Sequence, residues 1–204
     1  MMQPARQRLN VDIRRQQLLE LGLELFANHT YDGLSIDDIA KRAGVSKGLL
    51  YHYFPSKRAF YVAAVTAAAD QLVDETDIDA HGPEGPPNMD GVREVLRAFL
   101  GYVGRRRVEY LFLLGGGIGA DPEVGSILEG TRQALVNRMV RRLARFGVID
   151  NVETRIRLRG WIGFLEGSTL EWLQTDEVDE DAFLEMLIPM AGHVLTSAIG
   201  ASVR

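Results

Sequence analysis

Residues 35–60 read SIDDIAKRAGVSKGLLYHYFPSKRAF, and this stretch decides the fold of the N-terminal part of the chain. A serine N-cap accepts a hydrogen bond from an amide of the first helical turn, and apolar residues on either side of that turn pack as a hydrophobic staple. The pattern of apolar residue, serine and second apolar residue occurs three times, as Leu34-Ser35-Ile39, Val45-Ser46-Leu50 and Pro55-Ser56-Phe60. The stretch therefore predicts three helix starts in close succession.

A glycine, Gly44, separates the first two of these helices. Because glycine adopts positive φ angles without strain, it can end one helix and let the next begin at a steep angle. Two short helices joined by such a turn form a helix-turn-helix.

The second helix of the motif, over residues 46–54, has two different faces. Leu50 and Phe54 lie four residues apart, so we expect them to pack against the preceding helix. The other face carries Lys47, Gly48, Tyr51 and His52. Amine and phenol groups reach phosphates or base edges, and glycine permits close approach, so this face is suited to the major groove of DNA.

These residues follow a longer pattern, I-A-x-x-A-G-V-S-x-G-x-L-Y-x-Y-F-x-S-K, which is matched by Ile39-Ala40, Ala43-Gly44-Val45-Ser46, Gly48, Leu50-Tyr51, Tyr53-Phe54 and Ser56-Lys57. Residues 18–65 thus resemble the N-terminal DNA-binding domain of the TetR family of transcriptional regulators. One departure is Arg58, where the family often has an acidic residue, and we expect little consequence from it.

We expect the DNA contacts to come from the motif and its helix starts, at Ser35, Ser46, Lys47, Gly48, Leu49, Tyr51, His52, Tyr53 and Lys57. Helix-turn-helix shapes also occur as plain scaffold, in which the aromatic residues would be core and the lysines solvated surface. The length and spacing of the match favour DNA binding.

The distribution of charge supports this reading. The 204 residues carry a net charge of −5, but residues 1–60 hold nine Lys and Arg against six Asp and Glu, a net +3 that leaves −8 for the rest. A basic N-terminal region followed by an acidic remainder is typical of a DNA-binding domain attached to a part that does not bind DNA.

The chain has no cysteine and shows no signal peptide or membrane span, so we expect a cytoplasmic protein without membrane contact.

Apolar spacing predicts an all-α protein of about nine helices. Residues 1–10 are expected to be a polar arm that is either disordered or in contact with DNA, and a helix is expected over residues 11–28. An alanine-rich rod continues from Ser56, and a loop rich in proline spans residues 78–90. Further helices are expected over residues 91–104, 105–114, 121–146, 151–174 and 179–199, with Asp150 and Glu153 as a capping box.

The sequence GGGIGA at residues 115–120 formally fits a dinucleotide-binding fingerprint. The fingerprint requires a strand before it and a helix directly after it, whereas here Asp121-Pro122 follow and strands do not alternate with helices. We interpret the glycines as a hinge between helices.

No catalytic or metal-binding constellation is visible. The four histidines, His29, His52, His81 and His193, lie far apart and lack the spacing of metal-binding helices. We therefore expect neither an enzyme nor a cofactor. The alternatives are a helical enzyme with an incidental helix-turn-helix, or a protein-interaction module that uses the head to bind partner helices.

The last two helices have wide apolar faces, and Gly160, Gly163 and Gly167 would let another backbone approach. Both helices could pack inside their own subunit or pair with a second copy; the resemblance favours pairing, because TetR-family proteins dimerise through these helices and hold an effector in a cavity among the middle helices. Our candidates for that cavity are Phe99, Tyr102, Phe112, Trp161 and Phe164, which could equally be core.

The sequence thus predicts a DNA-binding domain over residues 1–60 and a helical effector-binding and dimerisation domain over residues 61–204. The expected function is that of a transcriptional regulator that represses its target genes. A small apolar or amphipathic effector is expected to release it from a near-palindromic operator on double-stranded DNA.

Overall fold

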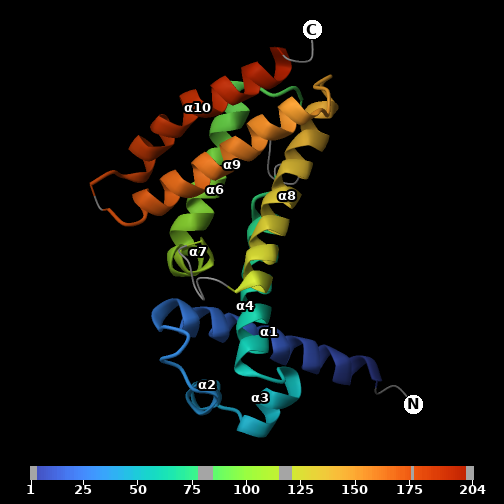
Figure 1. Ribbon diagram of the computed structural model, residues 1–204, viewed down its shortest axis with the longest axis vertical. Helices are drawn as coiled ribbons and strands as arrows, with labels where there is room; N and C mark the ends of the chain where they lie inside the picture. The colour runs from blue at the N-terminus through green and yellow to red at the C-terminus, as the bar shows by residue number, and fades with distance from the viewer. Residues whose placement is uncertain (1–3, 78–84, 115–120, 176, 201–204) are drawn as a thin grey trace. The chain divides into compact units, whose positions relative to one another are not determined.

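The computed structural model describes residues 4–77, 85–114, 121–175 and 177–200. Over these ranges the chain forms nine helices and no strand, which confirms the all-α prediction (Figure 1). The helices are α1 (Pro4–Asn28), α2 (Ile36–Arg42), α3 (Lys47–Tyr53), α4 (Lys57–Glu75), α6 (Met89–Arg105), α7 (Arg107–Leu114), α8 (Pro122–Ala144), α9 (Val152–Trp172) and α10 (Glu180–Gly200). None of these nine is both long and apolar enough to cross a bilayer.

The three predicted serine caps are all present. Ser35 Oγ accepts a hydrogen bond from Asp38 N at 3.1 Å, Ser46 Oγ from Leu49 N at 3.1 Å, and Ser56 Oγ from Ala59 N at 3.0 Å. Each bond satisfies an amide that has no partner inside its own helix. The helix starts of the motif are therefore fixed by interactions within three residues of sequence.

Two helix starts differ from the prediction. α1 begins at Pro4, so residues 4–10 extend the helix instead of forming a separate arm. At the start of α9 the N-cap is Asn151, whose side chain accepts from Thr154 N at 2.9 Å. Asp150, predicted to open a capping box, instead forms an ion pair with Arg155 at 2.7 Å.

Contacts divide the chain into two compact units. The first comprises residues 1–69 and 108–127, and the second residues 70–107 and 128–204. α4 and α8 each contribute residues to both units. This division describes packing, so the functional boundary at residue 60 stays a prediction. Two predicted segments lie outside the described residues: the hinge expected at residues 115–120, and residues 78–84 of the expected proline-rich loop, which include His81.

A group of aromatic rings lies in the core of the first unit, among buried aliphatic side chains such as Leu23 and Ile39. Phe26 contacts Phe60 with ring centroids 5.7 Å apart and Tyr61 at 4.9 Å, and Phe60 contacts Phe54 at 4.7 Å. We call this group, with Tyr31 and Phe112, the ring cluster. Because Phe54 directly follows α3 and Phe60 lies in the first turn of α4, the cluster anchors the end of α3 and the start of α4 to α1.

In the second unit, α10 packs against both α6 and α9. One core cluster is formed by Leu96, Leu100, Trp161, Phe183, Leu184, Leu187 and Ala191. A second cluster is formed by Val136, Val140, Leu143, Val148, Leu158, Ile162 and Ala198. Most members of these two clusters are aliphatic, with Trp161 and Phe183 as the aromatic exceptions.

Candidate functional site

α3 is fixed by two buried anchors, Leu50 and Phe54, which are 0% and 2% exposed. They are the two residues predicted to face inward. Gly44, in the turn before α3, has φ +62°, the left-handed conformation that the predicted turn requires. The orientation of α3 therefore follows from its anchors and from the turn.

The opposite face of α3 is exposed and rich in polar groups. Its exposed residues are Ser46, Lys47, Gly48, Leu49, Tyr51 and His52, and Tyr53 is half-buried against Phe54. A β-carbon added at Gly48 would have Ser46 Oγ, 4.0 Å away, as its nearest neighbour beyond the adjacent backbone, so the surface is open there. The structure thus places seven of the nine predicted DNA-contacting residues on or beside one helix, where amine, phenol and imidazole groups can meet phosphates and base edges.

Lys47 has a partner in the same motif. Its Nζ lies 2.8 Å from Asp37 Oδ2, and the hydrogen bond to this carboxylate raises the pKa of the Lys47 amine. Both side chains are more than half exposed, and an exposed pair of this kind contributes little to stability. Lys47 can therefore exchange Asp37 for a phosphate at small cost.

Lys57 is bound more firmly. Its Nζ donates to the Leu34 carbonyl at 2.7 Å and lies 4.1 Å from the centre of the Tyr31 ring. These contacts join the start of α4 to the segment before α2, where Ser35, the remaining predicted contact, caps α2. Lys57 therefore has a structural role whether or not it also contacts DNA.

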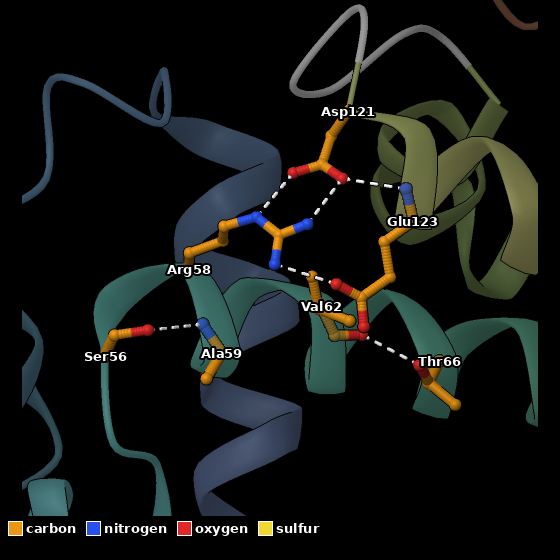
Figure 2. Close-up of polar contacts among 7 residues, drawn as sticks. All are labelled: Ser56, Arg58, Ala59, Val62, Thr66, Asp121 and Glu123. Carbon is orange, nitrogen blue, oxygen red and sulfur yellow. Dashed lines mark hydrogen bonds and ion pairs between the residues drawn. The ribbon is translucent and has the colours of Figure 1, made fainter.

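Arg58, the departure from the family pattern, is held by three contacts to the start of α8 that the sequence did not predict. Its Nε and Nη2 donate to the two carboxylate oxygens of Asp121 at 2.8 Å each, and its Nη1 lies 2.8 Å from Glu123 Oε2 (Figure 2). Asp121 Oδ1 also accepts from Glu123 N at 2.9 Å, so the same carboxylate caps α8. We call these three residues the arginine clamp.

The arginine clamp changes the protonation chemistry of its acid. The hydrogen bonds from Arg58 lower the pKa of the Asp121 carboxyl, even though burial acts in the opposite direction. Asp121 is mostly covered, with 8% of its side chain exposed. Sequence reasoning missed this site because its members lie 63 residues apart; the available signal was the unusual basic residue itself.

The second unit contains an apolar cavity of about 130 Å³. It is lined by residues of α6, α8, α9 and α10 and of the segment before α6, namely Pro86, Pro87, Asn88, Gly91, Val92, Val95, Leu96, Met139, Arg142, Leu143, Leu158, Trp161, Ala191, Val194 and Leu195. A mostly apolar cavity with a few polar groups is the usual form of a small-molecule site.

Of the five aromatic residues predicted to line a cavity, Trp161 is among the lining residues. Phe99 packs against a core cluster of the second unit, and Tyr102 is buried. Phe164 is 39% exposed and stacks on Trp161. Phe112 belongs to the ring cluster of the first unit, 5.4 Å from Tyr61. The structure therefore does not bring these five residues together at one site.

Comparison with known families gives two matches. Residues 18–64 match the model of the bacterial regulatory proteins of the tetR family. Residues 89–191, half of the chain, match the model of the tetracyclin repressor-like C-terminal domain. The two matches cover the helix-turn-helix and most of the second unit.

Individual proteins agree with these matches. The HTH-type transcriptional activator FasR of Mycolicibacterium smegmatis is 26% identical over 185 residues, which are 90% of this chain and 84% of FasR. A crystal structure of a tetR-family regulator from Streptomyces coelicolor is similar with a TM-score of 0.71 and 28% identity, over 94% of this chain and 82% of that one. The fold is also that of FadR from Bacillus subtilis, solved in complex with stearoyl-CoA, with a TM-score of 0.65 and 16% identity over 89% and 95% of the two chains.

Proposed function

Because this chain belongs to the tetR family of bacterial regulatory proteins and is a transcriptional regulator, not an enzyme, we propose that it is a homodimeric repressor released from its operator by a small apolar or amphipathic molecule. The observation that carries the proposal is the exposed face of α3, with Lys47, Gly48, Tyr51 and His52 held outward by buried Leu50 and Phe54. A helix with this face is suited to reading the major groove. The contacts predicted from the sequence are carried forward as part of this proposal, as is a cytoplasmic location, where chromosomal DNA lies.

Exposed apolar side chains on both α9 and α10 support the dimer. Val152 and Ile156 on α9 are 72% and 66% exposed, and Met186 and Met190 on α10 are 62% and 46% exposed. The two helices pack on one another (Figure 1). Exposed apolar side chains of this size are suited to an interface, and we propose that a second copy covers them.

The glycines of α9 fit the same interface. A β-carbon at Gly160 or Gly167 would meet no atom within 4 Å. Packing within the described part of this subunit therefore does not require glycine at these two positions. With Ile156 four residues before Gly160, they lie on one face of the helix. A partner helix can approach the backbone closely there.

Two-fold symmetry sets the form of the operator. A symmetric dimer presents two identical α3 helices, so the operator should contain two inverted half-sites, spaced by one helical turn of DNA or a small multiple. Repression is the direction we propose, because a bound dimer blocks the DNA it covers. FasR is named an activator, so the transcription assay should be able to detect both a decrease and an increase.

α8 offers a route from effector to DNA. Its first turn is held by Arg58 through the arginine clamp, and Met139 and Leu143 farther along the same helix line the cavity. Arg58 lies five residues after Tyr53, the last residue of α3. We infer that an effector which displaces α8 acts on α3 through this clamp, provided that the effector binds the displaced form more tightly.

Gel-shift assays test the DNA-binding part of the proposal. Genomic promoter fragments and scrambled DNA of equal length are titrated with purified protein at fixed salt, because affinities without a stated salt concentration cannot be compared. We expect some promoter fragments to bind at much lower protein concentration than scrambled DNA. Equal binding to all fragments, or none, would contradict the proposal and favour a protein-interaction module.

Sedimentation velocity tests the dimer. We expect Ile156→Glu to yield monomers at micromolar concentration, because it places a carboxylate inside the proposed interface. Ile13→Glu is the matched control: Ile13 is 52% exposed on α1 of the first unit. A wild-type monomer, or an unchanged dimer in Ile156→Glu, would contradict the assignment.

A further inference from the structure

The polar side chains among the described lining residues carry more hydrogen-bond donors than acceptors. Asn88 Oδ1 already accepts from Gly91 N at 2.8 Å, which uses one of its two lone pairs, and the Asn88 side-chain N–H groups can also donate. The guanidinium of Arg142 and the indole of Trp161 have donors and no acceptor. A ligand that accepts hydrogen bonds therefore matches this lining better than one that only donates.

The charge of the lining has one sign. Arg142 is its cation, and none of the described lining residues is Asp or Glu. Arg142 lies in the last turn of α8 beside exposed Arg141, with exposed Arg145 one turn further on. Arg142 already has an interaction within the protein, but its five N–H donors leave capacity for a carboxylate. Arg142 thus favours an anion, and none of the described lining residues carries a negative charge that could neutralise a cationic ligand.

The volume of the cavity limits how much of a ligand's apolar part it can enclose. An engineered cavity of roughly 150 Å³ in another protein binds benzene, and the cavity here is about 130 Å³. It therefore has room for one small ring or a chain of roughly six carbon atoms. The stearoyl chain seen in FadR is far longer than this.

We propose that the cavity binds a compact monocarboxylic acid, with its ring or short chain among the apolar side chains and its carboxylate at Arg142 and Asn88. This inference rests on the proposed function, in which the same cavity holds the effector. It adds the chemical class: a small weak acid, in preference to a cation, a neutral molecule or a long acyl chain.

Calorimetric titration of the full-length protein at pH 7 tests the class. The probes are hexanoate and benzoate, their neutral counterparts hexanamide and benzamide, the cation hexylamine, and the long-chain octadecanoate. We expect each carboxylate to bind at least about ten-fold more tightly than its amide, because a charge-assisted hydrogen bond contributes on that scale. Amides or hexylamine binding as tightly as the acids, octadecanoate binding more tightly than hexanoate, or no probe binding at all would overturn the inference.

Two neighbouring arginines provide a matched pair of variants. Arg142→Gln should remove the preference for carboxylates while leaving amide affinity unchanged, because the apolar part of the cavity is intact. Arg141→Gln removes the same charge from an exposed neighbour that does not line the cavity, and should keep the preference. Equal losses in both variants would mean that a general positive field, not a site at Arg142, attracts the acids.

Filling the cavity gives an independent check. Ala191 lines it and is 9% exposed, so Ala191→Leu should block every probe in a protein that still folds, as judged by its melting temperature. Retained binding in Ala191→Leu would place the site elsewhere and overturn the inference. Gel shifts without ligand separate failure of the ligand class from failure of the proposed function. A protein that binds an operator but no small acid contradicts the ligand class alone. A protein that does not bind DNA contradicts the proposed function.

Discussion

The two units of this protein are packed in different ways. In the first, six aromatic rings contact one another behind α3, and Phe60 and Leu50 are 0% exposed. In the second, aliphatic side chains surround a cavity of about 130 Å³. Closely packed rings hold a surface at a fixed position, whereas a cavity costs stability and is retained where a guest fills it. We therefore associate the first unit with a rigid DNA-reading surface and the second with ligand binding.

The largest effect is expected from opening the ring cluster. Phe60→Ala should lower the free energy of unfolding by about 3–5 kcal/mol, because it removes a fully buried ring and leaves a cavity. Urea denaturation followed by circular dichroism measures this loss. Phe146→Ala is the control, since Phe146 is 40% exposed and should cost far less. Equal losses would contradict the assignment of Phe60 to a closely packed cluster.

Two glycine-to-alanine substitutions, one in the core and one on the exposed face of α3, should have different effects on stability. A β-carbon at Gly22 would lie 2.6 Å from Cζ of Phe60, a ring held on several sides by the cluster, so Gly22→Ala should cost about 1–3 kcal/mol through overpacking. Gly48→Ala meets no such obstacle and should fold at least as stably, with a gain of up to about 1 kcal/mol in helix propensity.

The same Gly48→Ala variant should nevertheless bind operator DNA more weakly, because the added methyl group prevents close approach of α3 to the duplex. Thermal denaturation and gel shifts on both variants check the two expectations. A Gly48→Ala protein with unchanged operator affinity would remove Gly48 from the interface.

Lysines of the motif sharpen the distinction further. Lys47→Ala should lower the slope of log affinity against log salt by about 1 without changing the melting temperature, because its contact in the free protein is one exposed ion pair. Lys57→Ala should lower the melting temperature as well, because Lys57 holds the Leu34 carbonyl and the Tyr31 ring. If both variants keep the wild-type salt slope, the lysines do not contact phosphates.

The smallest effect is expected at the arginine clamp and depends on pH. The pKa of Asp121 is lowered below its ordinary value of 3.8 by Arg58, so the folded protein favours the charged carboxylate. This contribution to stability is present above pH 3.8 and is lost as the pH falls through the lowered pKa.

The difference in melting temperature between wild type and Asp121→Asn should accordingly be full at pH 7 and shrink as the pH is lowered below 3.8. Asp12→Asn, at an exposed position of α1, controls for the general loss of a carboxylate. A difference that does not change with pH would show that Asp121 acts through shape and capping instead of charge.

Local interactions explain which features could be predicted from the sequence. The serine caps and Gly44 depend on atoms within a few residues, and the inward face of α3 follows from the spacing of Leu50 and Phe54. Adjacent candidates are harder to rank, so Asp150 was predicted as the cap that Asn151 provides.

Long-range features were not predictable from one sequence. Phe112 was predicted to line the effector cavity, but it joins the ring cluster of the first unit. Arg58 was visible as an unusual residue, yet its partners Asp121 and Glu123 follow only from the fold. The cavity likewise depends on how α6, α8, α9 and α10 meet, and Trp161 alone of the predicted aromatic residues is found in its wall.

The most direct test of the account is to sequence the DNA fragments that the purified protein retains from its own sheared genome. The same experiment is run with Tyr51→Ala, because Tyr51 is 42% exposed on α3 and its removal should leave the melting temperature unchanged. We predict that wild-type fragments share a sequence with two inverted half-sites and that Tyr51→Ala loses this enrichment. Fragments without a shared two-fold sequence, or equal enrichment by the folded variant, would contradict the assignment of α3 as the DNA-reading surface.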